Sequence, residues 1–252
     1  MAESNSEAGY WGPIDTTITF CERNYSLSPY FAEFLNAISS SVYIIIGAYI
    51  IHKLGDDAWL RMAGLWLIGI GIGSFAFHMT MRFSLQLFDE IPMVLLVLTI
   101  IVAKTKSKHH EGIQRFSKLI DVSISVWAIT IIIVYIYFKE YQYFLHGFTA
   151  MVTVDAILTH MLRSKGSNIA MKKMTQLLSV SCILIGKTLW DIESRLCYKY
   201  QENVWLFHTI WHFFSAASAY NSCIFLYLCL KSDGDPIPKL LGYNRSEERK
   251  KD

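Results

Sequence analysis

Residues 58–79 read AWLRMAGLWLIGIGIGSFAFHM, a run in which Arg61 is the only formally charged side chain. A run of about 20 mostly apolar residues predicts a membrane-spanning helix, because hydrocarbon offers no partners to backbone amides and a helix satisfies them internally. Six more runs of this kind cover residues 34–53, 85–104, 118–138, 141–162, 173–194 and 204–231. The sequence therefore predicts an all-α fold, a seven-transmembrane helix bundle.

The composition agrees with an integral membrane protein. Of the 252 residues, 53% are hydrophobic and 17% are charged, whereas soluble domains carry about 25% charged residues. The net charge of +2 is small, and the apolar runs leave no basic face that a phosphate backbone would follow. We expect one integral domain whose surroundings are the bilayer, with no nucleic acid as a partner.

Lysine and arginine indicate which way the bundle faces, because short cytoplasmic loops carry an excess of them. With the N-terminus outside, 17 of the 23 basic residues fall on the cytoplasmic side and 5 on the other, which leaves Lys187 inside a span. This distribution predicts a non-cytoplasmic segment over residues 1–33, the seven-helix domain over residues 34–231 and a cytoplasmic tail over residues 232–252.

Polar side chains gather near the non-cytoplasmic ends of three predicted helices. His78 ends the second helix and Asp89 lies near the start of the third. His208 and His212 lie near the start of the seventh, four residues apart, as are Ser74 and His78, so each pair shares one helix face. Three imidazoles leave a tetrahedral zinc ion one open position, as a catalytic site requires. We therefore expect an intramembrane zinc site.

Other interpretations of these residues stay open. A single buried histidine is more often hydrogen-bonded to a neighbouring helix than bound to a metal. Asp89 precedes Pro92 near a helix start, where a negative side chain suits the helix dipole. His146, near the outer end of the fifth predicted helix, is the second-ranked candidate ligand. An aspartate inside a bilayer costs about 2.5–3.5 kcal/mol, so we expect Asp89 to face a cation or a polar cavity.

Glycines and cysteines give two smaller expectations. Gly69, Gly71 and Gly73 lie in an apolar helix with no lysine after them, which favours close helix packing over a phosphate-binding loop. Cys21 and Cys197 both fall on the non-cytoplasmic side, where a disulfide is permitted. The residues alone leave the bonded and the free states equally open.

Several separated motifs occur in a familiar order. They are Tyr10-Trp11-Gly12-Pro13, Cys21-Glu22-Arg23-Asn24-Tyr25, Ala32-Glu33-Phe34, Gly73-Ser74, Phe77-His78-Met79-Thr80, Leu87-Phe88-Asp89-Glu90-Ile91-Pro92-Met93 and His208-Thr209-Ile210-Trp211-His212. Together they resemble the alkaline ceramidase family over residues from about 10 to 220. The wider superfamily, which includes the adiponectin receptors, shares the seven helices and the zinc site, but the Tyr-Trp-Gly-Pro start points to the ceramidase branch.

The resemblance implies a ceramidase, an enzyme that hydrolyses the amide bond of ceramide to a sphingoid base and a free fatty acid. It places the protein in the endoplasmic reticulum or Golgi, with residues 1–33 in the lumen. The zinc ligands that it implies are His78, His208 and His212. Ser74 and Asp89 would be the catalytic partners of the attacking water, and Cys21 would be bonded to Cys197. The alternative is a lipid-binding, receptor-like protein with a structural zinc site.

A calcium site of the family is altered in this chain. The resemblance assigns it to Thr19, Phe20, Glu22, Asn24 and Glu33. The family pattern begins with aspartate where this chain has Thr19, and Arg23 adds a positive charge. Calcium prefers six to eight oxygen ligands and gains from carboxylates. We therefore expect calcium binding here to be weakened or lost, unless Asp15 compensates.

Overall fold

The computed structural model describes residues 9–107 and 110–230, and the described residues form helices and no β-strand. The helices are α1 (Phe34–Ser39), α2 (Ser41–Leu54), α3 (Ala58–Thr80), α4 (Phe83–Thr105), α5 (Glu111–Phe138), α6 (Tyr141–Leu162), α7 (Ile169–Val204) and α8 (Phe207–Leu230). In this part of the chain 7 segments are long and apolar enough to cross a membrane, α1 and α2 forming one of them. The predicted fold class is confirmed. The predicted tail, residues 232–252, lies outside the described residues.

Two of the predicted spans differ from the observed helices in their detail. The first is divided at Ser40, whose hydroxyl donates to the carbonyl of Asn36 at 2.8 Å, a bond that often bends a helix. The sixth was predicted to end at residue 194, but α7 continues past it and, after a kink at Tyr200, ends at Val204. Its last turns carry Arg195 and Lys199, and hydropathy detects the apolar part of a helix but not a polar extension of it.

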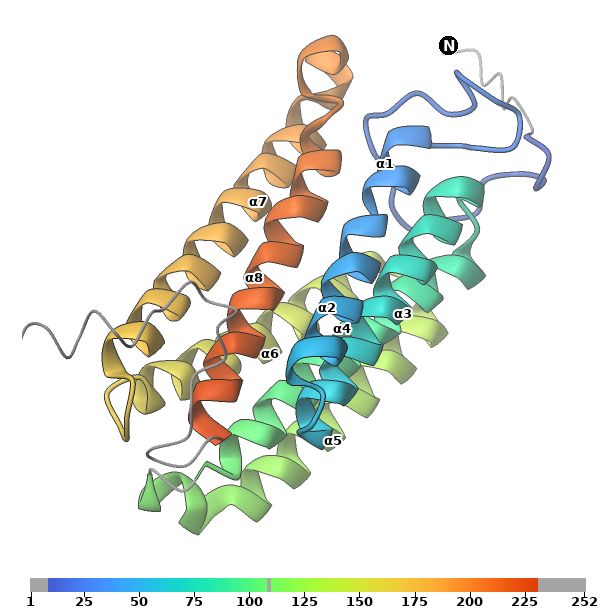
Figure 1. Cartoon of the computed structure of the whole chain (residues 1–252). Coiled ribbons are helices and arrows are strands. Elements are labelled where there is room, and N and C mark those ends of the chain that lie inside the picture. The colour runs from blue at the N-terminus through green and yellow to red at the C-terminus, as the bar shows by residue number, and fades with distance from the viewer. Residues whose placement is uncertain (1–8, 108–109, 231–252) are drawn as a thin grey trace, which may run out of the picture.

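Helices α3, α4 and α8 each contact several other helices of the bundle, and α2 packs on both α3 and α8 (Figure 1). Helix α3 lies between α2 and α4 and packs along both, and α8 packs along α7. By contrast, α6 and α7 barely touch although they are consecutive in the chain. Because α6 and α7 meet so little, the bundle is loosely closed on this side.

Glycines let α3 approach its neighbours closely. A Cβ atom on Gly73 would lie 2.1 Å from the carbonyl oxygen of Phe88 in α4, and one on Gly71 would lie 2.5 Å from a side chain of α2. One on Gly69 would lie 3.6 Å from Pro92, an ordinary contact distance. The predicted close packing is therefore confirmed at Gly71 and Gly73, and the contact at Gly73 brings the outer halves of α3 and α4 together.

The segment before α1 folds over the end of α3. The backbone N–H of Ala32 donates to the carbonyl of Met79 and that of Glu33 to the carbonyl of His78, each at 2.9 Å. These two bonds bring the Glu33 side chain to the end of α3 that carries His78.

Candidate metal centre

Three histidines from two helices meet inside the bundle. His78 comes from the last turn of α3, and His208 and His212 come from the first turns of α8. All three are buried, and one ligand atom from each lies within 4.8 Å of the others. The ring centroids are 5.1 Å apart for His78 and His208 and 4.7 Å apart for His208 and His212. The structure thus brings together the three residues that the sequence singled out.

Hydrogen bonds fix the orientation of two of these rings. The Nδ1 atom of His78 lies 2.7 Å from Oε2 of Glu33, and Nδ1 of His212 lies 2.7 Å from the hydroxyl of Ser39. With Nδ1 donating in each ring, Nε2 keeps its lone pair for a metal ion. A carboxylate or another acceptor behind a histidine is the usual arrangement at metal sites, where it sets the tautomer and the ring orientation.

Two unpartnered nitrogen atoms favour a metal site over ordinary buried histidines. Nε2 of His78 and Nδ1 of His208 are buried and have no hydrogen-bond partner among the described residues. A buried polar atom without a partner costs about 1–3 kcal/mol, and two such atoms side by side suit a cation between them. The residues present therefore fit a three-histidine metal site. Histidines that were merely hydrogen-bonded to neighbouring helices would not leave these two nitrogen atoms without partners.

His146, the second-ranked candidate ligand, is exposed on α6 and takes no part in the cluster. Its position near the outer end of a span matched that of the other histidines, but its side chain faces away from the centre. Depth along a helix is readable from a sequence more easily than the direction in which a side chain points.

Phe20 covers the centre from the side of the N-terminal segment. Its ring centroid is 3.8 Å from that of His208 and 5.0 Å from that of His78. The resemblance had assigned Phe20 to a calcium site, whereas its side chain here packs on two candidate zinc ligands. The cluster therefore has an apolar ring on the side of the N-terminal segment.

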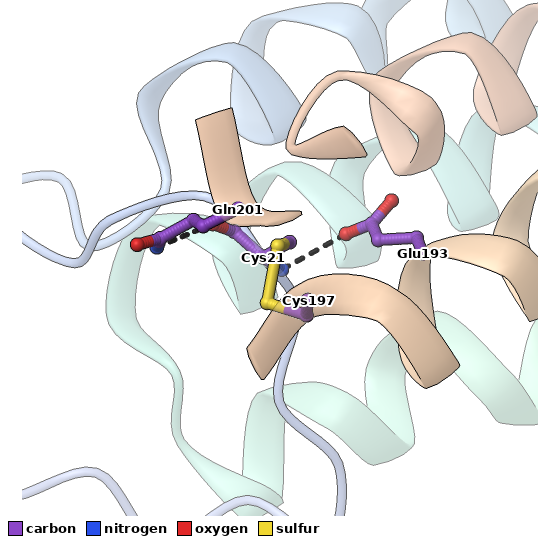
Figure 2. Close-up of a disulfide and its surroundings, with 4 residues drawn as sticks. All are labelled: Cys21, Glu193, Cys197 and Gln201. Atoms are coloured by element: carbon purple, nitrogen blue, oxygen red, sulfur yellow. Dashed lines mark hydrogen bonds between the residues drawn. A yellow bond between two sulfur atoms is a disulfide. The ribbon is translucent and has the colours of Figure 1, made fainter. Parts of the chain in front are cut away.

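The N-terminal segment is fastened beside Phe20. A disulfide joins Cys21 to Cys197 of α7, as the resemblance implied. Figure 2 shows Cys21 held by two further hydrogen bonds: its N–H donates to Oε1 of Glu193, and its carbonyl accepts from Nε2 of Gln201, both at 2.9 Å. Nothing in the sequence indicated Glu193, a buried acid that ties the segment to α7.

Asp89 and Ser74 adjoin the histidines across the α3–α4 contact. Asp89 is partly buried and has the Ser74 hydroxyl as its hydrogen-bonding neighbour. The hydroxyl of Ser40 lies 3.0 Å from that of Ser74. The next acid in the sequence, Glu90, accepts from Gln86 instead. Of the two adjacent acids, Asp89 is therefore the one that forms a pair with Ser74.

The residues of the predicted calcium site are largely occupied by other contacts. Thr19 is exposed, and the two carboxylate oxygens of Glu22 accept the N–H groups of Leu35 and Asn36 at 2.7 and 2.9 Å. Burial raises the pKa of Glu22, and these two hydrogen bonds partly offset that rise. Burial raises the pKa of Glu33, which accepts from Asn36, to about 8.

Two acceptor oxygens of this set remain without a partner among the described residues, Oδ1 of Asn24 and Oε1 of Glu33. Asp15 does not compensate for Thr19, since its carboxylate pairs with Arg82 at 3.2 Å and accepts the N–H of Phe83. Calcium prefers six to eight oxygens, so a bound ion would also need backbone carbonyls as ligands. Calcium binding stays a prediction.

A cavity of about 350 Å³ opens beside the histidines. Ser74, Asp89, His208 and His212 face it at one end, and side chains of α6 and α7 form most of its apolar wall. A second cavity of about 150 Å³ adjoins it and shares lining residues such as Phe148. An apolar space with a few convergent polar groups is the usual form of a site for a small molecule.

The fold and the site define a polytopic helical membrane protein with a buried three-histidine cluster that could hold a metal ion, beside an apolar cavity. A family model described as Ceramidase matches residues 12–245 of this chain. The chain therefore belongs to the ceramidase family. Membership places it among the ceramidase amidohydrolases, the enzyme class that the sequence predicted, and not among receptor-like proteins.

Similar proteins extend over most of the chain. Alkaline ceramidase 3 of Mus musculus is 28% identical in an alignment of 253 residues, gaps included, that spans 89% of this chain and 88% of that protein. An alkaline ceramidase of Saccharomyces cerevisiae is 28% identical over 209 residues, covering 77% of this chain and 66% of the yeast protein. The alkaline ceramidase of Arabidopsis thaliana is 25% identical over 246 residues, covering 92% and 91%.

Proposed function

We propose that this protein hydrolyses the amide bond of ceramide to a sphingoid base and a free fatty acid, with zinc held by His78, His208 and His212. The observation that carries the proposal is the three-histidine cluster, two members of which, His208 and His212, line an apolar cavity together with Ser74 and Asp89. Bound zinc would supply Lewis acidity, which makes an amide carbonyl more electrophilic and a water molecule more acidic.

Asp89 is the candidate general base. It lines the cavity beside the histidines, within the membrane-spanning part of α4, where an ionised aspartate requires a cationic or polar partner. A carboxylate oxygen of Asp89 accepts a proton from the attacking water and passes it to the leaving amine nitrogen, so the reaction needs no other acid.

Ser74 is the candidate donor to the amide oxygen. Its hydroxyl lines the same cavity end, and Ser40 lies behind it at 3.0 Å. A donor that meets the negative charge developing on that oxygen contributes about 2.7–4 kcal/mol to transition-state stabilisation in known cases. Gly73 positions Ser74 by allowing α3 and α4 to approach closely.

The cavity suits a substrate with long chains. Its wall is mostly apolar, and the weak contact between α6 and α7 leaves a side through which acyl chains can enter from the bilayer. We further propose that the N-terminal segment lies in the lumen of the endoplasmic reticulum or Golgi. The Cys21–Cys197 disulfide supports this orientation, because disulfides persist in oxidising compartments.

The test is fatty-acid release from a panel of ceramides by purified full-length protein in nanodiscs with zinc. We expect release by the wild-type protein, loss of release in His78→Ala, and wild-type rates in His146→Ala, which removes an exposed histidine outside the cluster. The proposal is wrong if no ceramide in the panel is cleaved, or if His78→Ala cleaves as fast as the wild type.

A further inference from the structure

Lys187 is a cation on the wall of the cavity that holds the metal centre. It lies in the membrane-spanning part of α7 and lines the cavity together with Trp190 and His208. Among the described residues that line this cavity and the adjoining one, it is the only lysine or arginine. A charged side chain inside a span is costly and marks a functional site more often than not. None of the steps proposed above uses it.

The ring of Trp190 connects the ammonium group of Lys187 to the histidine cluster. The Nζ atom lies 4.8 Å from the centroid of the Trp190 ring. That ring in turn lies 5.5 Å from the ring of His208. The indole ring of Trp190 therefore lies between the ammonium group and His208, a candidate zinc ligand. The face of a tryptophan ring attracts a cation, so Trp190 holds the ammonium group on the cavity side of α7.

Asp191 is the ion-pair partner of Lys187, one helical turn further along α7. The side chain of Asp191 is 48% exposed and that of Lys187 is 31% exposed, so the pair is not enclosed by protein. An ammonium group has three N–H donors. After Asp191 has accepted one of them, donors remain for an anion in the cavity.

We propose that Lys187 binds the carboxylate of a long-chain fatty acid in this cavity. The inference rests on the proposed function, because amide hydrolysis would form such a carboxylate beside the metal centre, from which it would move into the apolar cavity that Lys187 lines. An unpaired carboxylate is costly to hold in an apolar space. A lysine on the wall offsets that cost, with the acyl chain lying along α6 and α7. Asp191 competes with the fatty acid for the same ammonium group.

The test is direct binding of dodecanoate, below its micelle concentration, to the zinc-loaded full chain in an uncharged maltoside detergent without phospholipid. Dodecanol serves as the ligand control, since it has the same chain without the charge. Binding is followed by calorimetry and by tryptophan fluorescence, to which Trp190 contributes. The protein variants are Lys187→Met, which keeps the apolar length of the side chain, Lys187→Arg, which keeps the charge, and Asp191→Asn, which removes the competing carboxylate.

Lys187→Met is expected to weaken dodecanoate binding at least about tenfold, the loss of one charge-assisted hydrogen bond. Dodecanol binding should stay within twofold, Lys187→Arg should retain dodecanoate, and Asp191→Asn should tighten it. Lys187→Gln replaces Lys187→Met if the latter does not fold. The proposal is overturned if dodecanoate affinity falls less than threefold, or if dodecanol affinity falls equally. Because no ceramide is present, a protein that binds dodecanoate through Lys187 but cleaves no ceramide would refute the proposed function alone.

Discussion

Replacing Gly73 with alanine should separate catalysis from metal binding. The added Cβ would lie 2.1 Å from the carbonyl oxygen of Phe88 and 2.7 Å from the backbone nitrogen of Asp89. Both atoms belong to the α4 backbone, which cannot rotate out of the way as a side chain can. Ordinary contact requires more than 3.4 Å, so α4 must move away from α3 by more than an ångström.

The size of the effect follows from that displacement. Overpacking of this kind costs about 1–3 kcal/mol of stability. A misplacement of about 1 Å in a catalytic group lowers the rate by roughly 100-fold, and here Asp89 moves relative to Ser74. The three histidines come from α3 and α8, not from α4. Zinc binding should therefore survive in Gly73→Ala while ceramide hydrolysis falls about 100-fold.

The matched control lies one helical turn earlier on the same helix. A Cβ on Gly69 would meet Pro92 at 3.6 Å, an ordinary contact, so Gly69→Ala should keep both zinc and activity. Ceramide hydrolysis, zinc content and melting temperature are measured for both variants in one detergent. A Gly73→Ala variant within threefold of the wild-type rate, or a Gly69→Ala variant that loses as much activity, would show that the close α3–α4 contact does not position Asp89 and Ser74.

Three further outcomes follow from the residues around the centre. Glu33→Gln should lower zinc affinity about 10- to 100-fold, as loss of a carboxylate behind a ligating histidine does; competition with a chelator measures this, and an unchanged affinity would contradict the role given to Glu33. Mutating Cys21 and Cys197 to serine should lower stability by about 2–4 kcal/mol, seen as a lower melting temperature, whereas Cys182→Ser, at an unbonded thiol, should have little effect. In Thr19→Asp, added calcium should raise the melting temperature, because calcium binding gains from carboxylate charge. If calcium raises the melting temperature of the wild-type protein equally, the calcium site of this chain is intact.

Hydropathy and spacing together anticipate most of the fold and the core of the site. A membrane-spanning helix needs about 20 apolar residues whichever helices it packs against. Each of the seven spans can therefore be predicted from its own stretch of sequence. His208 and His212 lie one turn apart, and shared depth brings His78 to them. These features depend on periodicity and topology, which a sequence carries directly.

Contacts made by the loops are less predictable. Motif position assigns Glu33 and Phe20 to a calcium site, which stays a prediction, but it does not reveal that Glu33 contacts His78 and that Phe20 packs on His208. Their placement depends on how the N-terminal segment folds over α3, which no periodicity encodes. Ser39 is one of several serines in an apolar run, and only the crossing of α1 and α8 brings it to His212.

The proposed function requires that the three histidines hold one zinc ion and that ceramide hydrolysis depends on this ion. The most direct measurement strips the purified protein of metal, adds zinc stepwise and records fatty-acid release from ceramide against bound zinc. We expect activity to rise in proportion to zinc and to level off at about one ion per chain, with neither tight binding nor activity in the His208→Ala/His212→Ala variant. Stoichiometric zinc that persists in that double variant, or full activity in the stripped protein, would contradict the account.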